Sequence, residues 1–254
     1  MSAAAVDFQL TGRVAAVTGA NTGLGRAIAE ALAAAGADVA LIGRSDPAET
    51  LSAIQALGRR AAWVKADLGD KPEHGGIVAE VIARLGGLHV LVNNAGIIRR
   101  ANAVDFTEAD WDAVIDVNLK AVFFLSQAAA RHMIPAGGGK IINIASMLSF
   151  QGGIRVPSYT ASKSGIAGLT RLLANEWAAQ GINVNAIAPG YFATNNTAAL
   201  QADAKRSAEI LGRIPAGRWG NPQDLGGAAV FLAARASDYV HGVILPVDGG
   251  WLAR

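Results

Sequence analysis

Short apolar runs alternate with longer segments of helical character along this chain of 254 residues. The first run, 14–18, leads directly into glycine-rich sequence, and the alanine-rich stretch 26–35 then predicts a helix that stops at Gly36. Six further runs are predicted to be strands: 38–42, 62–66, 88–93, 140–145, 182–188 and 243–247. Apolar strands separated by crossover helices indicate an α/β fold, with a doubly wound sheet of about seven parallel strands covered on both faces.

The composition fits one domain over 1–254, with 194–221 expected to be an insertion that covers the substrate. Hydrophobic residues make up 52% of the chain and charged residues 17%, which is enough for a large core. A net charge of +2 without a basic run gives no support for nucleic-acid binding. The chain has no cysteine and its four histidines lie far apart in sequence, so no metal site is expected. No basic leader and no uninterrupted apolar stretch of about 18 residues is found, which predicts a cytoplasmic protein without a membrane span.

A glycine-rich turn joins the first predicted strand to the first predicted helix. Glycine allows a tight turn and a close approach of the backbone to a pyrophosphate, while the helix N-terminus offers unpaired N–H groups to the anion. Three glycines alone are a weak signal, but their place in the first strand–helix unit indicates a dinucleotide site of the Rossmann type. The residues expected to bind the cofactor here are Gly19, Asn21, Thr22, Gly23, Leu24 and Gly25.

The end of the second predicted strand bears on the choice between NAD and NADP. An acidic residue there would accept hydrogen bonds from the ribose 2′-OH and repel a 2′-phosphate, but the sequence has Gly43. Arg44 and Ser45 could together hold the 2′-phosphate, which favours NADP. In the alternative interpretation Arg44 is simply solvated and Asp46 faces the ribose from the loop, which would favour NAD.

Tyr159 and Lys163 are candidates for proton transfer because side chains four positions apart share one face of a helix. The lysine cation is expected to lower the pKa of the tyrosine, so that Tyr159 can accept or return the proton of an alcohol. Ser146 ends the fifth predicted strand, thirteen positions before Tyr159, and its hydroxyl is expected to bind the substrate oxygen. Ser149 is the competing serine, but it lies beyond the strand end.

These motifs together resemble the short-chain dehydrogenase/reductase family. The resemblance extends over 10–250 and rests on Thr18 with the Gly-x-x-x-Gly-x-Gly turn, on 93–96 and on the Ser146, Tyr159 and Lys163 spacing. It implies hydride transfer between NAD or NADP and a secondary alcohol or ketone, usually by a homotetramer. It also implies that Asn118 completes a catalytic tetrad by ordering a water that leads to Lys163. The resemblance also implies that Asp67, at the end of the third predicted strand, lies near the adenine. Further cofactor contacts implied by the resemblance are Leu68, Asn94, Ala95, Gly96, Tyr159, Lys163, Pro189, Gly190, Phe192 and Thr194.

Five stretches are similar to a subgroup of that family that acts on sugar acids of the gluconate type at C5: 94–100, 146–159, 191–197, 213–219 and 248–254. An anionic substrate agrees with Arg155 and Arg100, since a guanidinium binds a carboxylate through two parallel hydrogen bonds. Arg99 could equally be a solvated surface residue. Besides these arginines, the residues expected to contact the sugar acid are Ser146, Gln151, Tyr159, Asn195 and Asn196.

Two other functions remain open at this stage. The chain could be a 3-oxoacyl or polyol reductase on the same scaffold, or an NAD(P)-binding sensor or structural subunit without catalytic activity. The complete tetrad argues against the sensor. Trp251 and Leu252 make the last residues unusually apolar, so this tail is expected either to pack between subunits or to fold back on its own core.

Overall fold

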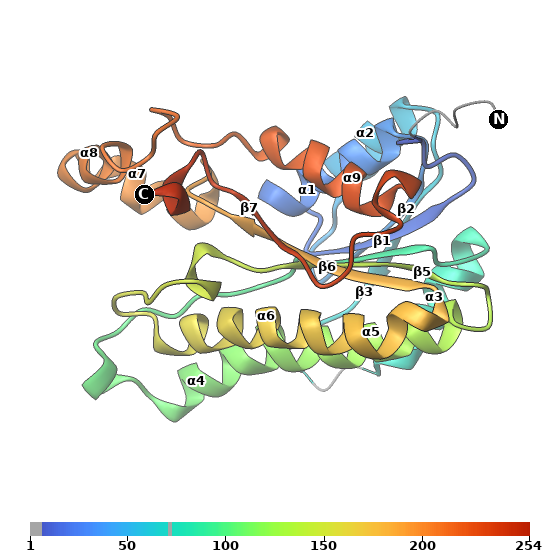
Figure 1. The fold of residues 1–254 in the computed structure, drawn as a ribbon, viewed down its shortest axis with the longest axis horizontal. Coiled ribbons are helices and arrows are strands. Elements are labelled where there is room, and N and C mark those ends of the chain that lie inside the picture. Colours follow the sequence, from blue (N-terminus) through green and yellow to red (C-terminus); the bar gives the residue numbers. More distant parts are fainter. Residues whose placement is uncertain (1–6, 71–72) are drawn as a thin grey trace.

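The computed structural model describes residues 7–70 and 73–254, and its centre is a single sheet of seven parallel strands (Figure 1). The strand order is β3-β2-β1-β4-β5-β6-β7, so the direction of winding reverses between β1 and β4. The predicted doubly wound, Rossmann-type sheet is confirmed. The strands are β1 (Val14–Thr18), β2 (Asp38–Gly43), β3 (Ala61–Lys65), β4 (Val90–Asn93), β5 (Gly139–Ile144), β6 (Ile182–Pro189) and β7 (Ile244–Val247).

Helices cover both faces of the sheet (Figure 1). One face carries α1, α2 and α9, and the other carries α3, α5 and α6. The helices of the described residues are α1 (Gly23–Ala34), α2 (Ala48–Ala56), α3 (His74–Leu85), α4 (Glu108–Ile115), α5 (Ala121–Met133), α6 (Pro157–Trp177), α7 (Ala198–Ala202), α8 (Ala204–Leu211) and α9 (Gly226–Ala233). Helices α7 and α8 lie within the segment 194–221, and α9 follows it.

The strands are largely apolar because each contributes to more than one core. Along β2, Val39 and Leu41 pack in the core under α1 and α9, whereas Ala40 and Ile42 pack in the core under α3 and α5. A strand that is buried on both faces therefore reads as a continuous apolar run rather than as an alternating one. This physical pattern explains why the strand positions could be predicted closely.

Two predicted strand ends were placed too late. The strands β3 and β5 end at Lys65 and Ile144, so Asp67 and Ser146 follow their strands instead of ending them. Both residues still lie at the carboxyl edge of the sheet. This is where ligands bind in open α/β sheets.

The helices α4 and α5 are joined by a π turn, Asp116–Lys120, into one run from Glu108 to Met133. By length and composition alone this run is apolar enough to cross a membrane, which the sequence analysis did not anticipate. Half of its most apolar stretch is buried within the protein, and its contacts include α3 and α6. That packing is typical of a core helix.

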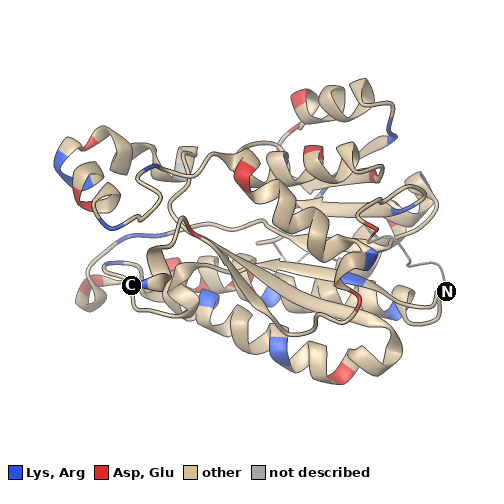
Figure 2. Ribbon diagram, turned by 45° about the horizontal axis from the view of Figure 1, so that its top comes forward, with Lys and Arg blue, Asp and Glu red and all other residues tan. Residues whose placement is uncertain are grey.

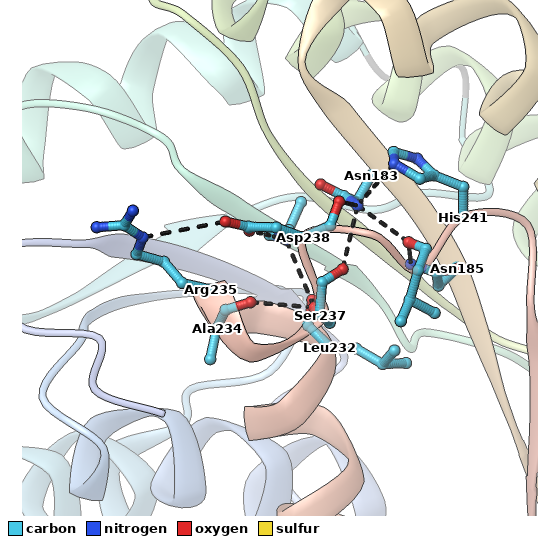
Figure 3. Close-up of polar contacts among 10 residues, drawn as sticks. Asn183, Asn185, Leu232, Ala234, Arg235, Ser237, Asp238 and His241 are labelled. Atoms are coloured by element: carbon cyan, nitrogen blue, oxygen red, sulfur yellow. Dashed lines mark hydrogen bonds and ion pairs between the residues drawn. The ribbon is translucent and has the colours of Figure 1, made fainter. Parts of the chain in front are cut away.

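A polar cluster fastens the segment before β7 to β6 (Figure 3). The amide nitrogen of Asn183 lies 2.9 Å from the carbonyl oxygen of Asp238 and 3.0 Å from that of Val240. Asn185 donates to the Val240 carbonyl oxygen at 2.8 Å and accepts from the Val243 N–H at 3.0 Å. These contacts fix the course of β7, and therefore the point at which the tail of the chain turns back.

Candidate active site

The turn after β1 requires glycine at its corners. Gly19 and Gly23 have φ values of +64° and +58°, a conformation that other residues rarely adopt. A Cβ atom on Gly25 would overlap the carbonyl oxygen of Gly19 and the side-chain amide of Asn94. Thr22 precedes α1 but its side chain does not cap the helix, and no acidic residue lies in the first turn. The first-turn N–H groups are therefore free of a side-chain cap and suited to an anion such as a pyrophosphate.

Thr18 connects this turn to the end of β4. Its hydroxyl oxygen accepts from the backbone N–H groups of Asn94 and Ala95, both at 2.9 Å. Asn94 in turn donates from its side chain to the Thr18 carbonyl oxygen at 2.9 Å. The two loops that flank the reversal of the sheet are thus locked together. In the sequence Thr18 is recognisable only as part of a motif, and no local pattern predicts this coupling.

The two residues expected near the adenosine meet at the ends of β2 and β3. Arg44 forms an ion pair with Asp67, with 3.5 Å between the nitrogen and the oxygen, and both side chains are exposed. Gly43 has open space where a side chain would project, and its carbonyl oxygen accepts from the indole N–H of Trp63 at 3.1 Å. Ser45 is exposed beside Arg44, and Leu68 is buried after Asp67. This edge offers a cation and an open position, but no carboxylate at residue 43.

Tyr159 and Lys163 lie on α6 and come together with Ser146, which follows β5. The ammonium nitrogen of Lys163 is 5.6 Å from the centre of the Tyr159 ring and donates to the Ile144 carbonyl oxygen at 2.6 Å. The side chain of Ser146 lies close enough to the phenol of Tyr159 to lower its pKa. Three members of the predicted tetrad therefore share one site at the carboxyl edge of β5.

Burial controls the ionisation of both groups on α6. It raises the pKa of Tyr159, against the hydrogen bond from Ser146 and the positive charge of Arg100, which lower it. It also lowers the pKa of Lys163 to about 8. The lowered pKa predicted for Tyr159 is therefore not found in this structure, because burial outweighs the groups that favour the phenolate. The Lys163 ammonium group bonds to a backbone carbonyl oxygen.

Asn118, the fourth member, lies in the π turn and is 1% exposed. Its side-chain oxygen accepts from the Ile97 N–H at 2.8 Å, and its nitrogen donates to the Ile97 carbonyl oxygen at 2.9 Å. The same nitrogen is 3.5 Å from the hydroxyl of Ser162, which precedes Lys163. Asn118 thus links the loop after β4 to α6. Its role in ordering a water stays a prediction.

Ser149 does not compete with Ser146 for the substrate oxygen. Its hydroxyl donates to the backbone carbonyl oxygen of Lys163 at 2.6 Å and is therefore committed to α6. The hydroxyl oxygen of Ser146 accepts from the Leu148 N–H at 3.2 Å, which holds it at the start of a short 3₁₀ turn, Met147–Ser149.

Three arginines expected near the substrate differ in their surroundings. Arg99 pairs with Asp110 at 3.2 Å and so faces α4. Arg100 is exposed and lies close enough to Tyr159 to influence its ionisation. Arg155 is also exposed and has a φ of +62°, an uncommon value for a residue with a side chain. Its carbonyl oxygen accepts from the Ala101 N–H at 3.1 Å, which brings the loops that carry Arg100 and Arg155 together.

The remaining expected contacts lie after β6 and near the tail. Gly190 packs closely against the backbone of Asp248. A Cβ atom on Gly190 would lie only 2.6 Å from the Asp248 Cα. Phe192 is buried, and Thr194 lies beside Gly23 at the start of the segment 194–221. Asn195 is exposed in the 3₁₀ turn Asn195–Thr197, whereas the side chain of Asn196 lies outside the described part of the structure.

A buried chain of polar side chains under the site was not predicted. Asn93 donates to Ser126 at 3.0 Å and to Asn143 at 2.9 Å, and Asn143 donates to Thr170 at 3.0 Å. These contacts join β4 and β5 to α5 and α6. The available signal was one asparagine in each of two apolar strands, but only the register, which pairs Asn93 with Asn143, brings them together.

Comparison with known proteins supports the interpretation of these motifs. The model of the short chain dehydrogenase family matches residues 13–205. The chain is 60% identical over 248 residues to 2-dehydro-3-deoxy-D-gluconate 5-dehydrogenase of Dickeya dadantii, with 97% of this chain and 98% of that protein covered.

Two solved structures superpose over nearly the whole chain. A protein of Agrobacterium tumefaciens with bound NADP is 61% identical and has a TM-score of 0.92, with 98% of this chain and 99% of that one covered. A gluconate 5-dehydrogenase of Burkholderia cenocepacia in complex with NADP and tartrate is 41% identical with a TM-score of 0.94, and 98% of each chain is covered. The resemblance found in the sequence is confirmed: the chain belongs to the short chain dehydrogenase family and is an NAD(P)-dependent oxidoreductase acting on CH–OH groups.

Proposed function

We propose that this enzyme interconverts a secondary alcohol and a ketone at C5 of a sugar acid of the 2-keto-3-deoxygluconate or gluconate type, with NADP preferred over NAD. The observation that carries the substrate class is the positive charge of Arg100 beside Tyr159. A cation next to the proton-transfer group favours a substrate that carries a carboxylate. The names of the relatives and the tartrate in one of the superposed structures agree with a hydroxy acid.

The proposed roles in the reaction follow from the contacts described. Ser146 donates to the substrate oxygen and stabilises charge that develops there. Tyr159, which lies beside Ser146, takes the alcohol proton in oxidation and returns it in reduction. Lys163 provides a buried positive charge that reaches from α6 to the end of β5, and Asn118 holds the loop after β4 in place. The bound nicotinamide supplies the hydride acceptor or donor.

The glycine turn after β1 fits the cofactor. Its corners admit only glycine, and the first turn of α1 has no side-chain cap within the described residues. The preference for NADP rests on Gly43 and Arg44, together with the NADP found in both superposed structures. The segment 194–221 begins beside Gly23 and is proposed to cover the substrate.

We further propose a cytoplasmic homotetramer that binds neither nucleic acid nor membrane. Trp111, Phe124 and Leu172 on α4, α5 and α6 are each at least 40% exposed, which suits a face that is covered by another subunit. Figure 2 shows Lys and Arg interspersed with Asp and Glu along the ribbon, a distribution that does not favour nucleic-acid binding. Analytical ultracentrifugation of the purified enzyme measures the oligomeric state directly.

The proposed activity can be tested by measuring turnover of three substrate classes with NADP and with NAD. The classes are sugar acids, neutral polyols and 3-oxoacyl thioesters. The expected result is turnover of 2-keto-3-deoxygluconate or gluconate and little turnover of the other two classes. Tyr159→Phe serves as the catalytic control, because it should bind cofactor normally and lose about a hundredfold or more in kcat. A preference for neutral polyols or acyl thioesters would refute the sugar-acid assignment, and cofactor binding without any turnover would favour the sensor.

A further inference from the structure

The tail of the chain folds back on its own chain. After β7, Gly249 and Gly250 adopt φ values of +66° and +89°, and the Asp248 carboxylate accepts from the N–H groups of Gly250 and Leu252, both at 2.9 Å. The Gly249 carbonyl oxygen accepts from the Ala216 N–H at 3.0 Å. These contacts seat the tail on the end of the segment 194–221.

The indole ring of Trp251, at the centre of this tail, is held on two sides and is only 4% exposed. The guanidinium of Arg213 lies 4.0 Å from the ring centre, and the ring of Tyr191 lies 4.9 Å from it. Arg213 follows α8, and Tyr191 follows β6. Because the ring is contacted by residues from two other parts of the chain, the direction of the indole N–H is fixed.

That N–H points to Gln151, with 3.4 Å between the indole nitrogen and the side-chain oxygen of Gln151. Gln151 lies on the loop between Ser146 and Tyr159. An indole N–H can only donate, so it selects the oxygen end of the amide and turns the nitrogen end away. The described residues provide no acceptor for that nitrogen, which carries two N–H donors.

We infer that Trp251 is a positioning residue that sets the polarity of the Gln151 amide, so that Gln151 presents N–H donors to an acceptor oxygen of the substrate. This inference rests on the proposed function. It assigns to the tail a part in substrate recognition and none in proton transfer or cofactor binding. The hydrogen bond is long, so the expected effect on substrate binding is modest.

Trp251→Phe tests the inference because it removes the N–H donor and keeps an aromatic ring between Arg213 and Tyr191. The KM for the sugar acid should rise about three- to tenfold, the range of a single neutral hydrogen bond, with kcat and the KM for NADP nearly unchanged. Trp219→Phe is the matched control. Trp219 also packs on Tyr191, at 5.5 Å, but its indole N–H donates no hydrogen bond to the described residues. Its kinetic constants should equal those of the parent.

Changes at Gln151 separate positioning from packing. Gln151→Glu keeps an acceptor for Trp251 but removes both donors, so the KM for the sugar acid should rise more than in Trp251→Phe. In a double-mutant cycle, adding Trp251→Phe to Gln151→Ala should cost nothing further, because the group that is positioned is gone. Additive effects, or an unchanged KM in Trp251→Phe, would overturn the inference. Failure of the proposed function would look different, because the parent enzyme itself would then turn over no sugar acid.

Discussion

The proposed cofactor side and the proposed substrate side of this site are built by different means. On the cofactor side the backbone sets the shape: Gly19 and Gly23 have positive φ values, Gly25 leaves no room for a Cβ atom, and Thr18 locks two loops through backbone N–H groups. On the substrate side the shape comes from side chains of three distant segments, which meet through Trp251, Gln151 and Arg213. The first side is specified by a short local motif, whereas the second depends on how the whole chain is folded.

The largest expected effect comes from the cofactor side. Gly25→Ala places a methyl group against the Gly19 carbonyl oxygen and the Asn94 side chain, both of which belong to the locked loops. The affinity for NADP should fall by about two orders of magnitude, the scale for overpacking of about 3 kcal/mol. Isothermal titration with NADP measures it. Gly227→Ala is the control, since its new methyl group meets nothing within 4 Å and should leave binding unchanged. Equal affinities for the two variants would contradict the rigid-turn interpretation.

The substrate side should respond to the loss of one arginine. Arg100→Ala should lower kcat/KM for sugar acids about tenfold to a hundredfold, the range of a charge-assisted hydrogen bond, and spare neutral polyols. It also removes a charge that lowers the pKa of Tyr159, so that pKa rises and the pH profile of alcohol oxidation moves to higher pH. Arg155→Ala tests whether Arg155, and not Arg100, binds the carboxylate.

Arg99→Ala is the matched control for these arginines, because Arg99 already pairs with Asp110. Its kinetics should resemble those of the parent. If Arg100→Ala and Arg155→Ala both handle sugar acids like the parent, carboxylate recognition by these arginines is wrong, while the dehydrogenase assignment stands.

Cofactor choice should change less. Gly43→Asp puts a carboxylate into open space at the end of β2, where it would repel a 2′-phosphate and accept hydrogen bonds from a 2′-OH. The ratio of the two dissociation constants should shift toward NAD by about tenfold, equal to 1.4 kcal/mol. Dissociation constants for NAD and NADP, measured in the parent and in the variant, show whether the cofactor preference has shifted. A parent that prefers NAD tenfold or more would overturn the NADP assignment.

The last expected effect is on folding stability instead of binding or turnover, and it concerns Lys163, which lies between the two sides. Its pKa is lowered from 10.5 to about 8, so the unfolded chain binds more protons than the folded one between these values. Below about pH 8 the burial of Lys163 therefore lowers the free energy of unfolding by its full amount. This loss shrinks as the pH rises toward 10.5, so the protein becomes more stable over that range. Denaturant titrations across this range should show that rise in the parent and a smaller one in Lys163→Met. Parallel curves would show that the burial of Lys163 is not linked to folding.

The difference between the two sides also explains what could be predicted from the sequence. The strand 14–18 was placed exactly, and the glycine turn was assigned to the correct junction, because both depend on neighbouring residues. Asp67 and Ser146 were placed at strand ends although they follow them, since backbone pairing ends before the apolar pattern does. The Asn93–Asn143 contact and the position of Gln151 depend on residues 50 and 100 positions apart, which no local pattern reveals.

The π turn at Asp116–Lys120 can be regarded as a one-residue insertion that the helix has retained. Deleting one residue there would restore regular helical hydrogen bonding, so the deletion would be mild for the helix itself. It would rotate every preceding side chain by about 100° relative to α5, since an α-helix has about 3.6 residues per turn. Asn118 would then no longer face Ile97, and the loop after β4 would lose both of its hydrogen bonds to that side chain. In a library of length variants, this short stretch should therefore tolerate substitution better than deletion.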